Sequence, residues 1–167
     1  MGERFEIDPG ASKVWLEGSS SVHPIRAHAS GLTGWVELLS KDGQEEIDGE
    51  VRIDVGLLKS GNPLVDRETK RRINAAEHPE IIGTVIGSKR TGSLVAGGEH
   101  YEVHGEIGFR GHVGPAHGEV TASLADDTLT VEGTETFDVR DWGLTLPRMG
   151  LLKVHPDVEV RIELVAR

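Results

Sequence analysis

The chain has 167 residues, the length of one domain that can bury roughly 70% of the surface exposed by its unfolded form. Its formal net charge of -10 excludes the broad basic surface that nucleic-acid-binding proteins usually carry. The sequence contains no cysteine, which excludes disulfides, thiolate nucleophiles and zinc–sulfur sites. We therefore expect one domain over residues 1–167 and no nucleic-acid partner.

The sequence lacks the usual signals for membrane insertion. No apolar run reaches the roughly 20 residues that a membrane-spanning helix needs. The first six residues also lack the charged and then apolar pattern of a signal peptide. We expect no membrane span and a cytoplasmic protein; a periplasmic or secreted location is expected only if a signal peptide has been removed.

The first half of the chain contains short segments in which apolar and polar residues alternate. Such alternation is typical of strands with one buried and one wet face. It predicts strands at residues 13–17, 32–39 and 49–55.

A helix is predicted over residues 62–77, where the alternation stops. Asn62 is a suitable N-cap, Pro63 suits the first helical turn, and Pro79 lies just beyond the end. An apolar stripe is formed by Leu64, Val65, Ile73 and Ala76. Two roles are open for this insert: packing against a barrel for stability, or closing the mouth of a barrel.

A basic cluster on the same helix also has two interpretations. Arg67, Lys70, Arg71 and Arg72 alternate with acidic residues, as on an ordinary solvated helix face. The same cations could instead contact acidic head groups.

Alternation returns after the helix and is clearest in the second half of the chain. It predicts strands at residues 81–88, 101–109, 118–124, 129–139 and 158–164. Together with the first three, they make about eight strands separated by short, turn-rich segments. This spacing favours an all-β antiparallel barrel or sandwich over a fold of alternating strands and helices.

The order of several short motifs resembles the YceI-like family. The resemblance covers nearly the whole chain and depends on the order of the motifs, since none is specific alone. The motifs are Ser-Ser-Val-His-Pro-Ile at 20–25, Gly-Leu-Thr-Gly-Trp-Val-Glu at 31–37, Ser-Gly-Asn-Pro-Leu-Val-Asp-Arg-Glu at 60–68, Ala-Glu-His-Pro-Glu-Ile at 76–81, Tyr-Glu-Val-His-Gly-Glu-Ile-Gly-Phe-Arg-Gly-His-Val-Gly-Pro at 101–115 and Phe-Asp-Val-Arg-Asp-Trp-Gly-Leu at 137–144.

This resemblance implies an eight-stranded, lipocalin-like antiparallel β-barrel with one helical insert. It also implies a long apolar tunnel for an isoprenoid or fatty-acyl-type chain, and it permits a homodimer without specifying one. From the alternating apolar faces we expect the tunnel to be lined by Trp35, Val103, Ile107, Phe109, Val120, Leu129, Val131, Phe137, Trp142, Leu144, Met149 and Leu151. The predicted function is therefore non-catalytic binding of a long-chain apolar small molecule, for carriage, storage or sequestration.

Two other classes of function stay open at this stage. The chain has eight histidines, which a metal-dependent enzyme could use, but their spacing forms no recognisable metal site. The usual metalloprotease, serine-hydrolase and phosphate-binding motifs do not occur in the sequence. We therefore expect no catalytic residue, no metal and no cofactor. The other alternative is a structural or interaction module whose barrel is packed with side chains.

Overall fold

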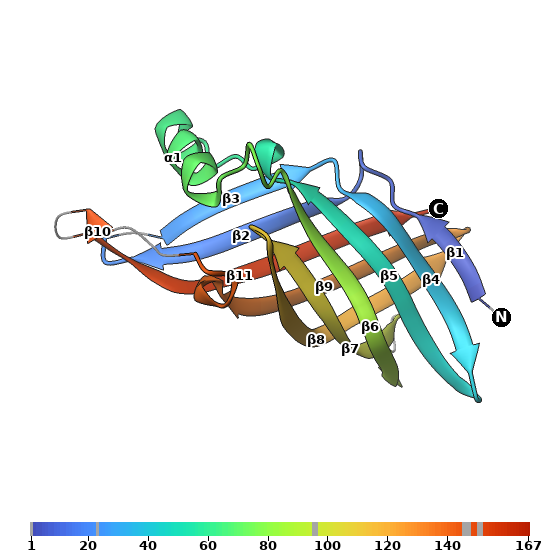
Figure 1. Cartoon of the computed structure of the whole chain (residues 1–167). Helices are drawn as coiled ribbons and strands as arrows, with labels where there is room; N and C mark the ends of the chain where they lie inside the picture. Colours follow the sequence, from blue (N-terminus) through green and yellow to red (C-terminus); the bar gives the residue numbers. More distant parts are fainter. Residues whose placement is uncertain (1, 23, 95–96, 145–147, 150–151) are drawn as a thin grey trace.

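The chain folds into a single curled antiparallel sheet with one α-helix at its edge (Figure 1). The structure is a computed structural model that describes residues 2–22, 24–94, 97–144, 148–149 and 152–167. Within that part of the chain the sheet has 11 strands, in the spatial order β1-β4-β5-β6-β7-β8-β9-β11-β2-β3, with β10 paired to β11. This is the lipocalin-like all-β fold that the sequence predicted.

Long strands separated by tight turns dominate the element order. The strands are β1 (Gly2–Glu6), β2 (Lys13–Ser20), β3 (Pro24–Ser30), β4 (Thr33–Lys41), β5 (Gln44–Asp54), β6 (Glu80–Ser93), β7 (Glu99–Phe109), β8 (His112–Ala125), β9 (Thr128–Asp138), β10 (Arg148–Met149) and β11 (Leu152–Ala166). The helical elements are the 3-10 turns η1 (Val55–Leu57) and η2 (Val139–Trp142) and the α-helix α1 (Pro63–Ile73).

Three hairpins are closed by two-residue turns, at 42–43, 110–111 and 126–127. Both central residues of each turn have positive φ. Turns of this kind match the twist of the flanking strands and fix their register. They join β4 to β5, β7 to β8 and β8 to β9, which sets which residues of these strands face inward.

The two edges of the sheet are partly joined by other segments. Beyond β1, Ile7 forms an isolated bridge with Ala166 of β11, and Glu6 exchanges two backbone hydrogen bonds of 2.9 Å with Arg167. On the other edge, His28 of β3 exchanges backbone hydrogen bonds of 3.0 and 2.9 Å with Lys59. These bonds curl the sheet around a shared interior.

All eight predicted strands are present, and three further strands were not predicted. β1, β3 and β10 account for the difference in number. β1 has five residues, of which only Phe5 is buried, and β10 has two residues. β3 presents small side chains such as Ala27 and Ala29, which give little contrast in hydrophobicity along the strand.

The helix is shorter than the predicted 62–77. Asn62 accepts hydrogen bonds from the N–H groups of Leu64 and Val65, as an N-cap does. Asn74 adopts a left-handed conformation with φ of 58°, which ends the helix at Ile73. Ile73 is buried against the sheet, whereas Leu64 is 70% exposed, so α1 packs mainly through its C-terminal end.

We expect Asn62→Ala to destabilise α1 by about 1 kcal/mol, because the first turn loses its side-chain acceptor. Hydrogen exchange of the α1 amides, followed by mass spectrometry, should accelerate by about fivefold. Thr69→Ala, at an exposed position within the helix, is the control and should not accelerate exchange. Equal behaviour of the two variants would show that the cap does not hold this helix.

The core is formed by inward-pointing apolar side chains from strands across the whole curled sheet, together with side chains of η1 and α1. The buried members are Phe5, Ile7, Val14, Ala29, Leu32, Val36, Ile47, Val55, Leu58, Ile73, Tyr101, Ala122, Leu129, Val131, Leu164 and Ala166. At this core, burial raises the pKa of the Tyr101 phenol.

Candidate ligand-binding site

Five neighbouring strands, β7, β8, β9, β11 and β2, share one apolar inner face. Their register places residues with buried side chains opposite one another: Ala122 faces Val131 across β8 and β9, and Val131 faces Leu164 across β9 and β11. Because successive side chains alternate between the faces of a strand, every second residue from these positions also points inward. The inner face therefore extends along the paired parts of these strands.

Burial decreases along this inner face from one end to the other. Leu129 and Ala166 are completely buried, and Val131 is nearly so. Further along the same face, Val120 and Val160 are only partly buried, although they still pack against the core. Burial thus decreases toward the end of the strands that carries η2 and the turn at 110–111. Around Leu129, Val131 and Ala166 the interior is closely packed, although Leu124 at the turn is exposed, and apolar side chains toward η2 remain partly accessible.

Most of the predicted lining residues in the described part of the chain lie on this face. Leu129 and Val131 belong to the buried core, while Val103, Phe109 and Val120 are partly buried and pack against it. Alternation places two further residues, Ile107 and Phe137, on the same inner face, and both are partly exposed.

Trp142 reaches the same face from η2. Its Nε1–H donates a 2.8 Å hydrogen bond to the carbonyl of Ile107, and its ring meets Phe137 edge-on at 6.0 Å between centroids. A β-carbon at Gly114 would lie 3.0 Å from the indole, so the absence of a side chain there makes room for the ring. Trp142 is 4% exposed and is one of the buried residues at the more accessible end of the interior.

Trp35 lies on the outer face of the sheet, which corrects the prediction that it lines the interior. Its neighbour Val36 points into the core, and the guanidinium of Arg4 lies 4.3 Å from the Trp35 ring centroid. Apolar residues occur in both phases of β4, so alternation alone could not decide which set faces inward. The pairing of β1 with β4 brings Arg4 to the outer side.

The remaining predicted residues follow η2. Leu144 is partly buried, and its N–H bonds the carbonyl of Val139 at 3.3 Å. Met149 belongs to β10, but its side chain lies outside the described structure, as does Leu151 entirely.

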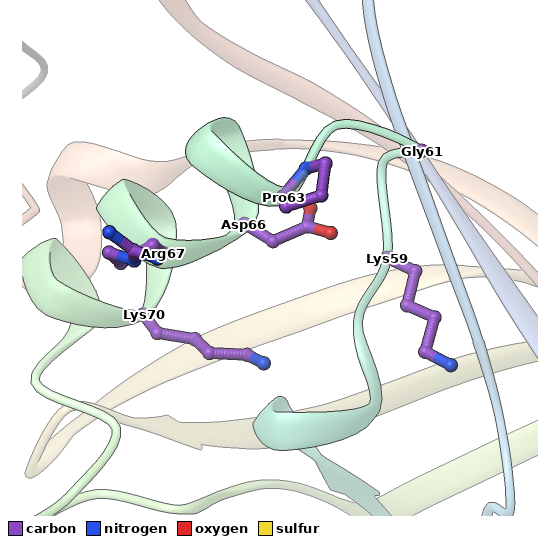
Figure 2. A pocket seen from close by; sticks show the side chains of 6 residues that line it. All are labelled: Lys59, Gly61, Pro63, Asp66, Arg67 and Lys70. Carbon is purple, nitrogen blue, oxygen red and sulfur yellow. The ribbon is translucent and has the colours of Figure 1, made fainter.

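A cationic hollow lies beside the N-terminal half of α1 (Figure 2). It has a volume of about 580 Å³ and is lined by Lys59, Gly61, Pro63, Asp66, Arg67 and Lys70. Figure 2 shows Lys70 extending from the helix toward the loop that carries Lys59. Among the described residues, none of the three cations is within ion-pair distance of a carboxylate, so this hollow could accept an anion.

Asp66, the acidic residue of this hollow, is bound to the adjacent loop. Its Oδ1 accepts hydrogen bonds from the Ser60 hydroxyl at 2.6 Å and the Ser60 N–H at 2.8 Å. These bonds, with smaller contributions from Lys70 and Lys59, hold the pKa of Asp66 below its ordinary value.

Three histidines of β7 and β8, His100, His104 and His117, lie on the outer face. The rings of His104 and His117 stack at 6.1 Å, and His100 Nδ1 lies 3.3 Å from the Thr121 hydroxyl. Within the described ranges, no group of three or more His, Asp or Glu residues is arranged to hold a metal ion. A shallow hollow of about 300 Å³ on this face is lined mainly by polar residues, including Glu119.

The family is decided by a match of the YceI-like domain model to residues 5–166. The chain belongs to the YceI-like family. No curated protein matches it. None of the helices in the described segments is long and apolar enough to cross a bilayer.

Solved structures share the YceI-like fold at low sequence identity. A polyisoprenoid binding domain from Saccharophagus degradans, implicated in plant cell wall breakdown, is 15% identical with a TM-score of 0.78, and the match covers 98% of this chain and 97% of that one. BcnA from Burkholderia cenocepacia is 15% identical with a TM-score of 0.77, covering 96% and 99%. The Campylobacter jejuni YCEI protein is 11% identical with a TM-score of 0.63, covering 86% and 85%.

One polar residue on the inner face of this YceI-like sheet was missed by the sequence analysis. Glu135 shares the phase of Val131 and Phe137 on β9 and pairs with Val160 of β11. The sequence does contain the signal, because an acidic residue interrupts an otherwise apolar phase at 129–139. A strand pattern tolerates one such exception, so the position did not stand out.

Proposed function

We propose that the chain binds a long apolar molecule of the isoprenoid or fatty-acyl type in the interior of the curled sheet, without catalysing a reaction. The observation that carries this proposal is the decrease in burial along the inner face of β7, β8, β9, β11 and β2. An interior filled by its own side chains would be buried to a similar degree at both ends. The family and the polyisoprenoid-binding relative support the same proposal.

Elementary energetics make such binding feasible. Removing apolar surface from water contributes about 25 cal/mol per Å², or about 0.8 kcal/mol for each buried methylene. A chain of a dozen carbons can therefore offset the cost of association without a strong polar anchor. Selectivity would follow from the length and shape of the accessible interior. The protein would carry, store or sequester its ligand, in the cytoplasm if the sequence-based prediction of its location holds.

The direct test is native mass spectrometry of gently purified protein, followed by organic extraction. The proposal expects a stoichiometric lipid-like mass, or stoichiometric uptake of dodecanol by protein purified empty. A protein that takes up neither would contradict it. A metal scan and turnover assays on the same sample address the enzyme alternative.

Phe109→Asp should weaken dodecanol binding by about thirtyfold, because it places a charge on the apolar face that the chain would cover. Phe109 is only partly buried, so its replacement perturbs the core less than a change at Val131. The control is Val113→Asp, at a position 69% exposed on the outer side of the same hairpin. Titration calorimetry measures both. Equal affinities for the two folded variants would show that Phe109 does not line the site.

A further inference from the structure

On the inner face of β9, toward the end that carries η2, lies the carboxylate of Glu135. β9 pairs with β11 without a break in register through this region, so Glu135 lies directly opposite Val160. Val160 packs against the core, and Leu129 and Val131 of the same strand phase are buried in it. Side chains two residues apart on a strand point to the same side. Glu135 therefore points inward, between apolar neighbours.

Its carboxylate occupies space that Gly118 leaves free. A β-carbon at Gly118 would lie 2.7 Å from Glu135 Oε2. The pairing of β8 with β9 runs from the turn at 126–127 as far as Val120 and Gly133, so Glu135 and Gly118 lie just beyond the last paired residues. The carboxylate thus sits over β8 at the point where β8 and β9 cease to be hydrogen-bonded.

Within the described structure, Glu135 has little to compensate for the loss of water. It accepts one hydrogen bond, of 3.3 Å, from the adjacent Thr136 N–H, and it takes part in none of the ion pairs found there. Partial exposure now lets solvent satisfy the remaining acceptor sites. A chain lying along this face would displace that water, and an acceptor left without a donor is costly.

We propose that Glu135 selects ligands whose apolar chain carries a hydrogen-bond donor, above all a protonated amine, at the point that reaches its carboxylate. This inference depends on the proposed function, since it concerns the same interior. Apolar neighbours such as Val160 and Phe137 contact the alkyl chain of the ligand, and the Glu135 carboxylate accepts a hydrogen bond from its polar group. A hydroxyl satisfies the same acceptor without the charge, whereas a ligand carboxylate is repelled.

Three probes with the same chain test this preference: dodecylamine, dodecanol and dodecanoate, each below its micelle-forming concentration. Titration calorimetry of the unmodified protein should give affinities in that order, with the amine about tenfold tighter than dodecanoate. Glu135→Gln should reduce this ratio by about tenfold, while dodecanol affinity changes less than about threefold.

Glu132→Gln is the matched control, because it removes the same charge from the outer face of the same strand. It should leave the ratio of amine to dodecanoate unchanged. An unchanged ratio in Glu135→Gln, or an equal reduction in Glu132→Gln, would overturn the inference. Equal affinities for dodecylamine, dodecanol and dodecanoate would overturn this inference but would still support the proposed function. If no probe binds, both fall together.

Discussion

Gly34→Ala is expected to destabilise the protein by about 4 kcal/mol, enough to unfold much of the population of a marginally stable domain. Gly34 has φ of 128°, a conformation that side chains disfavour. A β-carbon there would also lie 1.9 Å from the carbonyl oxygen of Glu50 on the paired strand. The backbone cannot move away freely, because the Gly34 carbonyl accepts the Ile7 N–H at 3.0 Å near the seam between β1 and β11.

Gly43→Ala separates backbone strain from the steric clash. Gly43 also has positive φ, 78°, but a β-carbon there would meet no atom within 4 Å. Its substitution should cost about 1–2 kcal/mol, the strain of a left-handed conformation alone. Guanidinium unfolding monitored by tryptophan fluorescence measures both variants. Equal losses would show that contact with Glu50 does not constrain this part of the sheet.

The fold was predictable because alternation and tight turns carry most of its information. The segment at 101–109 alternates cleanly and became β7 with the predicted inner face. The N-cap at Asn62 was also predictable from the sequence. The end of the helix before Asn74 was not, since no unambiguous sequence pattern marks an asparagine in the left-handed conformation. The strands β1 and β3 were not predicted, because β1 is short and β3 carries small side chains. Few of their residues show a contrast in hydrophobicity between the two faces.

The position of a predicted lining residue on the inner face was predictable only where apolar and polar residues alternated without ambiguity. Val103 and Phe109 have apolar residues in one phase only, and both lie on the predicted face. Around Trp35, apolar residues occupy both alternating sets of positions, so the pattern does not show which set faces inward. The contact of its ring with Arg4 of the paired strand β1 reveals the outward position, and the sequence of β4 alone does not contain that information. Glu135 was missed for the opposite reason, because its apolar neighbours outweighed it in the pattern.

Trp142→Ala should cost about 3–5 kcal/mol, the usual penalty for removing a buried aromatic side chain from a packed site. The loss combines the cavity left against Gly114 and Phe137 with a carbonyl at Ile107 that no longer receives its 2.8 Å hydrogen bond. Trp142→Phe should cost less, because most of the ring volume is kept and only the N–H is lost. Chemical unfolding measures both variants.

Trp15→Ala provides the comparison for Trp142. Trp15 lies on the outer face with the Arg161 guanidinium 4.0 Å from its ring centroid, and it is only partly buried. Its removal should cost about 1 kcal/mol, since an exposed cation–π contact is weak and no buried cavity remains. A Trp142 variant no less stable than the Trp15 variant would mean that the indole is not a fixed part of the interior. A large difference would identify Trp142 as the rigid wall against which an apolar chain could pack at the more accessible end of the sheet.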